Sequence, residues 1–179
     1  MNDEVLTLTY LNEDDRAYGL AGMAISLAAL DAIDKVASVS LDNTDEPMVT
    51  FSHEYYFCGS PSISPKTTWD NMLRNFYITS AMVVGNVASR SLVRMKQREI
   101  PKRLLDDIFE VIAEEGRESC SLDNDELQAI YDRSYRQSQR IFGNPRVHAA
   151  IDEFVRVLAR RRILSGGELA DELRLLQLI

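Results

Sequence analysis

The chain has 179 residues, a formal net charge of −8 and a hydrophobic fraction of 45%, which is typical of a globular protein and excludes a disordered or collagen-like one. Its longest apolar stretch, residues 20–30, is shorter than the about 20 residues that a membrane-spanning helix needs. The chain begins with acidic residues rather than the basic ones of a secretory signal, and two cysteines are too few for a disulfide framework. We therefore predict a soluble cytoplasmic protein with no membrane contact and no cofactor.

The acidity of the chain is confined to its N-terminal third. Residues 1–65 contain eleven acids but only two bases, Arg16 and Lys35, whereas residues 66–162 contain seventeen bases and fourteen acids. The central part of the chain is therefore slightly basic, and its bases could meet either the acids of the N-terminal third or an acidic partner.

The first predicted element is a helix over about residues 13–37. Asn12 followed by three acids is typical of a helix N-cap with a first turn that complements the helix dipole. Apolar residues then recur at steps of three and four up to Val36, which is the period of an amphipathic helix.

Residues 38–65 break the helical pattern. Turn-forming residues at 42–47 precede a segment, residues 48–57, in which apolar side chains alternate as in a strand. We predict a small β-hairpin near residues 38–60, with this strand paired to residues 37–41 or to residues 5–10. An irregular loop stays open as the alternative.

The next predicted element is a long helix over residues 65–98. Ser64 and Pro65 suit the N-cap and the first helical position, and no proline follows before Pro101. At a rise of 1.5 Å per residue this helix would extend roughly 45–50 Å. That length predicts the central element of the fold.

Four shorter helices are predicted after it, at residues 101–115, 123–142, 145–164 and 168–178. Gly116 is expected to end the first, capping boxes begin the second and the fourth, and residues 165–179 are expected to dock on the core. The predicted fold is mainly α: one domain over residues 1–179, a bundle of about six helices around a long central helix.

Two stripes of small residues predict a close contact between helices. One consists of alanines at 17, 21, 24, 28 and 32, and the other of Ala81, Gly85 and Ser89. Side chains this small let helix axes approach to the low end of the usual 8–10 Å separation. The simplest interpretation is that the two stripes face each other within the chain, and the alternative is that the second forms a homodimer seam.

Arginines concentrate in residues 90–103 and 133–162, where helical spacing places several on shared faces. The candidate partner-binding residues are Arg90, Arg94, Arg133, Arg136 and Arg140. Three interpretations stay open: a solvated face or pairing with acids of the first 65 residues, binding of an acidic protein, and binding of nucleic acid. The net charge of −8 weakens the electrostatic attraction that nonspecific DNA binding requires, so nucleic acid is not favoured.

Catalytic and metal-binding motifs are missing from the sequence. His53 and His148 belong to no zinc-binding spacing, and His53 and Cys58 would point to opposite faces of a strand. The acids of residues 106–118 give only a weak indication of an all-α metal-dependent hydrolase. The aromatic residues between 51 and 77 line a pocket or, as a simpler alternative, seal the core.

By elimination, we predict a non-catalytic interaction or regulatory module that associates with itself, as a homodimer, or with another protein. A nucleic-acid-associated protein that uses the arginine faces and a metal-dependent hydrolase are the alternatives. The sequence predicts no catalytic, cofactor-binding or metal-binding residue.

Overall fold

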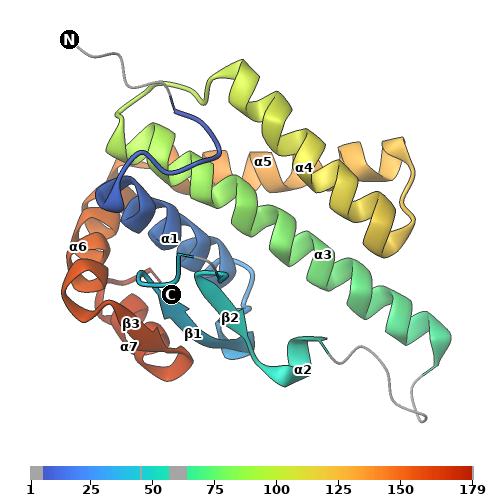
Figure 1. Ribbon diagram of the computed structural model, residues 1–179, viewed down its shortest axis with the longest axis horizontal. Coiled ribbons are helices and arrows are strands. Elements are labelled where there is room, and N and C mark those ends of the chain that lie inside the picture. Colours follow the sequence, from blue (N-terminus) through green and yellow to red (C-terminus); the bar gives the residue numbers. More distant parts are fainter. Residues whose placement is uncertain (1–5, 45, 57–63, 179) are drawn as a thin grey trace.

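The computed structural model describes residues 6–44, 46–56 and 64–178. Within these ranges the fold is mainly α, with a small antiparallel sheet, as the sequence predicts (Figure 1). The α-helices are α1 (Glu13–Ala28), α2 (His53–Tyr56), α3 (Pro65–Ala88), α4 (Lys102–Cys120), α5 (Asn124–Phe142), α6 (Pro145–Arg161) and α7 (Gly166–Leu175). A 3-10 helix, η1 (Ile33–Lys35), and a π-helix, η2 (Ser89–Arg94), accompany the strands β1 (Val36–Ser40), β2 (Val49–Phe51) and β3 (Ile163–Ser165).

Helix α1 begins as predicted and ends earlier. The Asn12 side chain accepts a hydrogen bond from the backbone N–H of Asp15 (2.9 Å), which caps the helix. The predicted continuation to residue 37 is wrong, because Asp31 adopts a left-handed conformation (φ 51°). The N–H of Ala32 then bonds back to the carbonyl of Leu27, a Schellman closure in which an aspartate takes the place usually held by glycine.

The sheet has the order β2-β1-β3, and both pairings are antiparallel. Val39 in the central strand is opposite Val49 of β2 and Leu164 of β3, so the predicted hairpin between residues 37–41 and the following strand is confirmed over residues 49–51. The predicted strand ends early because α2 follows, and Tyr55 of α2 stacks on Phe51 (3.9 Å between ring centroids). The rest of that prediction, with Cys58, lies outside the described residues.

Strand β3 replaces the end of a predicted helix. The helix predicted over residues 145–164 ends at Arg161, because Arg162 has a positive φ of 65° and turns the chain into the sheet. Buried Leu164 then packs from β3 into the core. The last predicted helix, α7, begins with its capping box and ends at Leu175 rather than at residue 178.

The long central helix is present but changes its winding. The Ser64 hydroxyl accepts a hydrogen bond from the N–H of Thr67 (3.2 Å), as expected of the N-cap. After Ala88 the α-helix continues as the π-helix η2, which ends at Arg94 instead of residue 98. A π-helical segment is rare and frequently marks a functional or structurally constrained position.

Helices α1 and α3 cross with their backbones in near contact. A Cβ atom at Gly22 would lie 2.2 Å from the carbonyl oxygen of Gly85 and 2.7 Å from Cβ of Ser89. A Cβ at Gly85 would in turn meet Ser26 at 1.9 Å. The contact predicted for Gly85 is therefore made within the chain, where the atoms nearest to a Cβ at this position belong to Ser26 and Gly22 of α1. Ala81 is buried as well.

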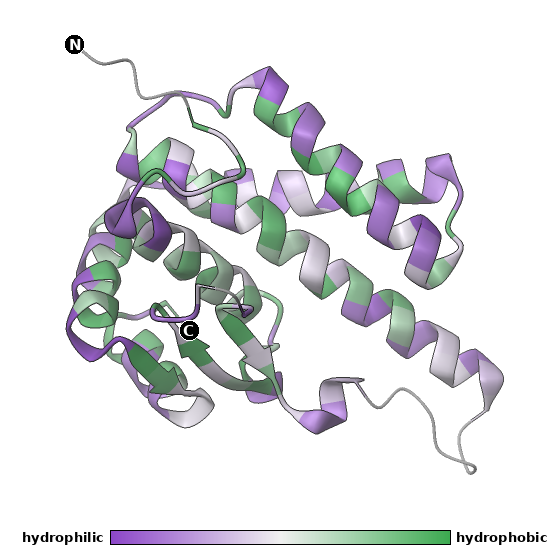
Figure 2. Ribbon diagram, viewed as in Figure 1, coloured by the Kyte–Doolittle hydropathy of each residue, from purple (hydrophilic) through white to green (hydrophobic). Residues whose placement is uncertain are grey.

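The remaining helices pack around this crossing. Helix α1 contacts α3 and α6, while α3 contacts α4 and α5. Past its acidic first turn, α1 is mostly hydrophobic in Figure 2, whereas α4 carries broad hydrophilic stretches. Gly116 does not end its helix as predicted, because it lies inside α4, where a Cβ would meet Phe76 and Leu127. Within the described ranges, none of the helices has the length and apolarity that crossing a bilayer requires.

The substitution Gly22→Ala tests the helix crossing. The new methyl group has no space against the Gly85 backbone, so we expect a loss of about 1–3 kcal/mol in the free energy of unfolding, measured by urea denaturation. Gly167→Ala is the matched control, because nothing lies within 4 Å of a Cβ there. Equal stability of the two variants would show that the helices do not meet at these glycines.

Candidate partner-binding groove

The five arginines that the sequence groups together fall into two sets. Arg90 is completely buried, and Arg94 is mostly so. The other three, on α5, are exposed. Only the α5 residues can therefore meet a partner at the surface, and we call Arg133, Arg136 and Arg140 the arginine stripe.

Arg90 forms a buried ion pair with Asp15, and both side chains have 0% exposure. Its Nε and Nη2 donate to Oδ1 and Oδ2 of that carboxylate at 2.9 and 2.6 Å, the bidentate geometry that suits a guanidinium. Nη2 also donates to the carbonyl of Thr9 (2.9 Å), and the N–H of Leu11 donates to Asp15 (2.9 Å). The pair thus attaches the segment before α1 to α1 and to the π-helix η2.

Arg94 follows one turn later and also faces α1. Its Nε lies 2.8 Å from Oδ2 of Asp14, and its Nη1 lies 3.7 Å from Oδ1 of Asp15. Both arginines belong to the π-helix η2, whose wider turn places them beside the acidic first turn of α1. Two of the predicted partner-binding residues are thus internal, bonded to acids of the N-terminal third.

The arginine stripe borders a surface groove between α5, α3 and the end of α1. Two adjoining cavities of about 570 and 440 Å³ form this groove and share Leu30, Tyr77 and Arg133. Arg74 of α3 is exposed at its edge. In the described part of the chain, none of the four bordering arginines pairs with a carboxylate, so their charges are open to a ligand. We call this feature the arginine groove.

Hydrogen bonds and a cation–π contact fix the side chains in the middle of the groove. The Tyr77 hydroxyl donates to Oε1 of Gln137 (2.6 Å), and Nε2 of Gln137 donates to the carbonyl of Ala29 (3.4 Å). The guanidinium carbon of Arg133 lies 4.3 Å from the centroid of the Tyr77 ring, a cation–π contact. The far end is lined mainly by apolar side chains, including Leu73 and Ile130. The groove therefore combines an apolar end with a cationic end.

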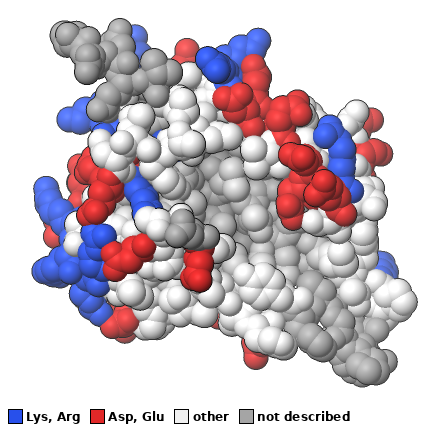
Figure 3. All heavy atoms as spheres, viewed as in Figure 1, with Lys and Arg blue, Asp and Glu red and all other residues white. Residues whose placement is uncertain are grey.

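An exposed acidic surface lies on α4. Asp107, Glu110 and Glu114, which we call the acidic stripe, are exposed and have no ion pair among the described residues. Acidic side chains gather over α4 on the face shown in Figure 3. Val111 lies beside them and is 44% exposed, so this face of α4 carries an apolar residue among acids.

The structure gives no support to a metal site in the part of the chain that it describes. Within residues 6–44, 46–56 and 64–178, no group of three or more His, Cys, Asp or Glu side chains could hold a metal ion. His148 bonds to the carbonyl of Phe142 (2.6 Å). The acids proposed as hydrolase ligands instead lie along the exposed side of α4.

The predicted aromatic cluster does not form one site. Phe51 and Tyr55 are buried and stack on each other, whereas Trp69 is largely exposed. Tyr77 is the member that lines the arginine groove. Of the two interpretations left open, buried Phe51 and Tyr55 fit a sealed core and Tyr77 fits a pocket lining, and the i, i+3 spacing of Tyr77 from Arg74 was a signal for their shared face.

Comparison with known proteins found no matching family model and no matching curated protein. The interpretation of the arginine groove therefore depends on its geometry and charge alone.

Removing the charge of Asp15 tests the internal role of Arg90. Asp15→Asn leaves a buried guanidinium without its counterion, so we expect the free energy of unfolding to fall by about 3–5 kcal/mol. Asp14→Asn is the matched control, because Asp14 is 62% exposed and an exposed ion pair contributes at most about 1 kcal/mol. Urea denaturation of both variants gives the comparison. Similar small losses in both would contradict a buried pair.

Proposed function

We propose that the protein is a non-catalytic interaction module that associates with itself. The contact joins the acidic stripe of one copy to the arginine groove of another. The observation that carries this proposal is the matched spacing of two exposed, unpaired stripes of opposite charge.

The two stripes have the same helical geometry. The acids of the acidic stripe stand at i, i+3 and i+7, and so do the bases of the arginine stripe. Each set therefore lies on one face of its helix and extends about 10.5 Å along it. Two helices that pack side by side can bring each carboxylate opposite a guanidinium without a change in either backbone.

The apolar parts of the two surfaces are also complementary. The acidic face of α4 exposes Val111, and the arginine groove has an apolar end that includes Leu30, Leu73 and Ile130. An amphipathic acidic helix fits such a groove because its apolar residue is buried while its carboxylates meet the arginines. Helix α4 has this chemistry and is present in every copy.

The charge distribution also favours self-association over nucleic-acid binding. The protein has a net charge of −8, and the acidic stripe would repel a phosphate backbone. The removal of Arg90 and Arg94 from the surface shortens the basic face further. An acidic protein surface is therefore the better ligand for the groove. Exposed ion pairs contribute at most about 1 kcal/mol each, so the contact is weak and sensitive to salt.

Charge reversal of each stripe tests the contact. Two variants are needed: Arg133→Glu/Arg136→Glu/Arg140→Glu and Asp107→Lys/Glu110→Lys/Glu114→Lys. We expect sedimentation velocity to show wild-type association at low salt, monomers for each variant alone, and renewed association when the two variants are mixed, because mixing restores opposite charges across the contact.

Controls separate this result from a general charge effect. Lys66→Glu/Arg146→Glu/Arg160→Glu changes the net charge by the same amount at exposed positions outside the groove, and it should associate like the wild type. Mixed variants that stay monomeric would refute the pairing of the stripes. A wild-type chain that stays monomeric but is retained on heparin, with retention lost in the arginine-stripe variant, would replace self-association by nucleic-acid binding.

A further inference from the structure

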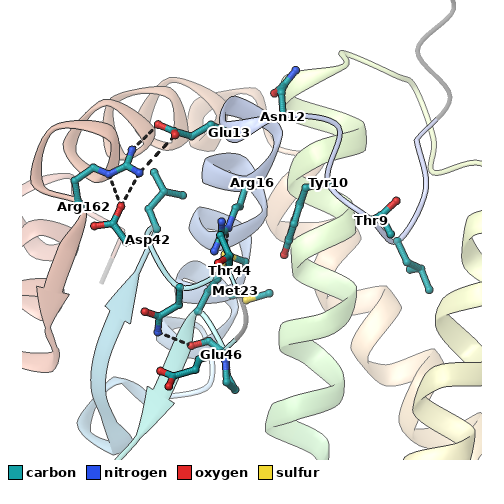
Figure 4. Close-up of a pocket in the computed structure, with 15 residues that line it drawn as sticks. Thr9, Tyr10, Asn12, Glu13, Arg16, Met23, Asp42, Thr44, Glu46 and Arg162 are labelled. Atoms are coloured by element: carbon teal, nitrogen blue, oxygen red, sulfur yellow. Dashed lines mark hydrogen bonds and ion pairs between the residues drawn. The ribbon is translucent and has the colours of Figure 1, made fainter.

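Another cavity lies on a different part of the molecule, between the segment before α1, α1 itself and the turn that joins β1 to β2. Its volume is about 810 Å³, within the range of small-molecule sites. Figure 4 shows Arg16 near the centre of its lining, between Tyr10 and the residues of the β1–β2 turn. We call this feature the Arg16 pocket.

Arg16 is a half-buried cation without a carboxylate partner. Its Nε donates to the sulfur of Met48 (3.2 Å), and among the described residues it forms no ion pair. A thioether is a weak acceptor, so the strong donors at Nη1 and Nη2 stay free for an oxyanion. A guanidinium presents these two donors in the fork that matches a carboxylate.

The acids around the pocket are largely committed to other bases. Arg162 bonds to both Glu13 and Asp42, as the dashed lines in Figure 4 show. Asp14 and Asp15 are held by the arginines of η2. These acids are therefore fixed away from Arg16, which leaves its guanidinium available.

The charge of the lining selects the kind of anion. The described lining residues include two bases, Arg16 and Arg162, and three acids, Glu13, Asp42 and Glu46, so the cations do not outnumber the acids. A polyphosphate would meet more repulsion than attraction, whereas a single carboxylate needs only the fork of one arginine. The pocket therefore favours a monoanion.

The walls of the pocket indicate what the anion is attached to. Met23, Met48 and Leu41 contribute apolar surface, and methionine side chains adapt to irregular ligands. The Tyr10 hydroxyl accepts a hydrogen bond from Asn86 (2.7 Å), and burial raises the pKa of Tyr10, so this wall stays neutral. An apolar body of several carbon atoms fits between these side chains.

We infer that the Arg16 pocket binds a monocarboxylate with an apolar body, such as a medium-chain fatty acid, with its carboxylate on the Arg16 guanidinium. This site is separate from the arginine groove and does not depend on self-association.

Decanoate is a suitable probe, with decanol as its uncharged counterpart and inorganic phosphate as a polar anion. We expect saturable binding of decanoate in calorimetry, with shifts of the Met23 and Met48 methyl signals in NMR spectra. Decanol and phosphate should bind at least about tenfold more weakly, because decanol lacks the carboxylate and phosphate lacks the apolar body.

Two substitutions in the pocket and one control complete the test. Arg16→Gln should weaken decanoate binding about tenfold or more, and Glu46→Gln should strengthen it, because it removes an acid from the rim. Arg146→Gln, at an exposed position outside both the pocket and the arginine groove, should leave it unchanged. Decanoate affinity that is unaffected by Arg16→Gln, or equal binding of decanol, would overturn the inference. A methyl spectrum that decanoate does not alter would also overturn it, even if Arg16→Gln failed to fold.

Discussion

The buried pair between Asp15 and Arg90 connects two parts of the chain that are 75 residues apart in sequence. It joins the first turn of α1 to the π-helix that follows α3, and through the carbonyl of Thr9 it also holds the segment that precedes α1. Burial of two charges is costly unless hydrogen bonds compensate. Here the bidentate geometry, the N–H of Leu11 and the ring of Tyr10, whose centroid is 4.8 Å from the guanidinium carbon, supply part of that compensation, while Nη1 of Arg90 has no hydrogen-bond partner among the described residues.

The pair lies beside one of the two surfaces for which we propose ligands. The segment fixed by the pair forms one wall of the Arg16 pocket, and its Tyr10 is further held by Asn86 of α3. At the other end of α1, beyond the crossing of Gly22 with Gly85, Leu30 lines the arginine groove. The same two helices thus support one site near each end of their contact. Arg90 and Arg94 bind acids within the chain, whereas the arginines on α5 stay exposed at the surface.

Local signals explain what the sequence could predict. The N-caps at Asn12 and Ser64 and the capping boxes at Asp123 and Ser165 involve neighbours within three residues, so each of these helix starts was predictable. The hairpin followed from alternation and turn residues in the same way. The recurrence of apolar residues at steps of three and four likewise predicted a mainly helical fold.

Interactions between distant residues explain what it could not. Several elements end at residues other than glycine with positive φ, such as Asp31 and Arg162, where the usual glycine signal is missing. The spacing of Arg90 and Arg94 resembles that of the arginines on α5, and only the three-dimensional contact with Asp15 separates a buried base from an exposed one. The arginine stripe was predictable from its spacing, whereas the groove beside it depends on the packing of three helices. Arg16 had one signal, its isolation as a base within an acidic segment.

We propose that surfaces of opposite charge, the acidic stripe and the arginine groove, hold copies of the chain together. The most direct test of this proposal is the mass of the wild-type protein by light scattering across a salt series at one protein concentration. At about 0.01 M salt, where the Debye length is about 30 Å, the mass should exceed the 20.3 kDa of one chain. It should fall to that value at about 1 M, where the Debye length is about 3 Å. A mass of one chain at every salt concentration would contradict the account.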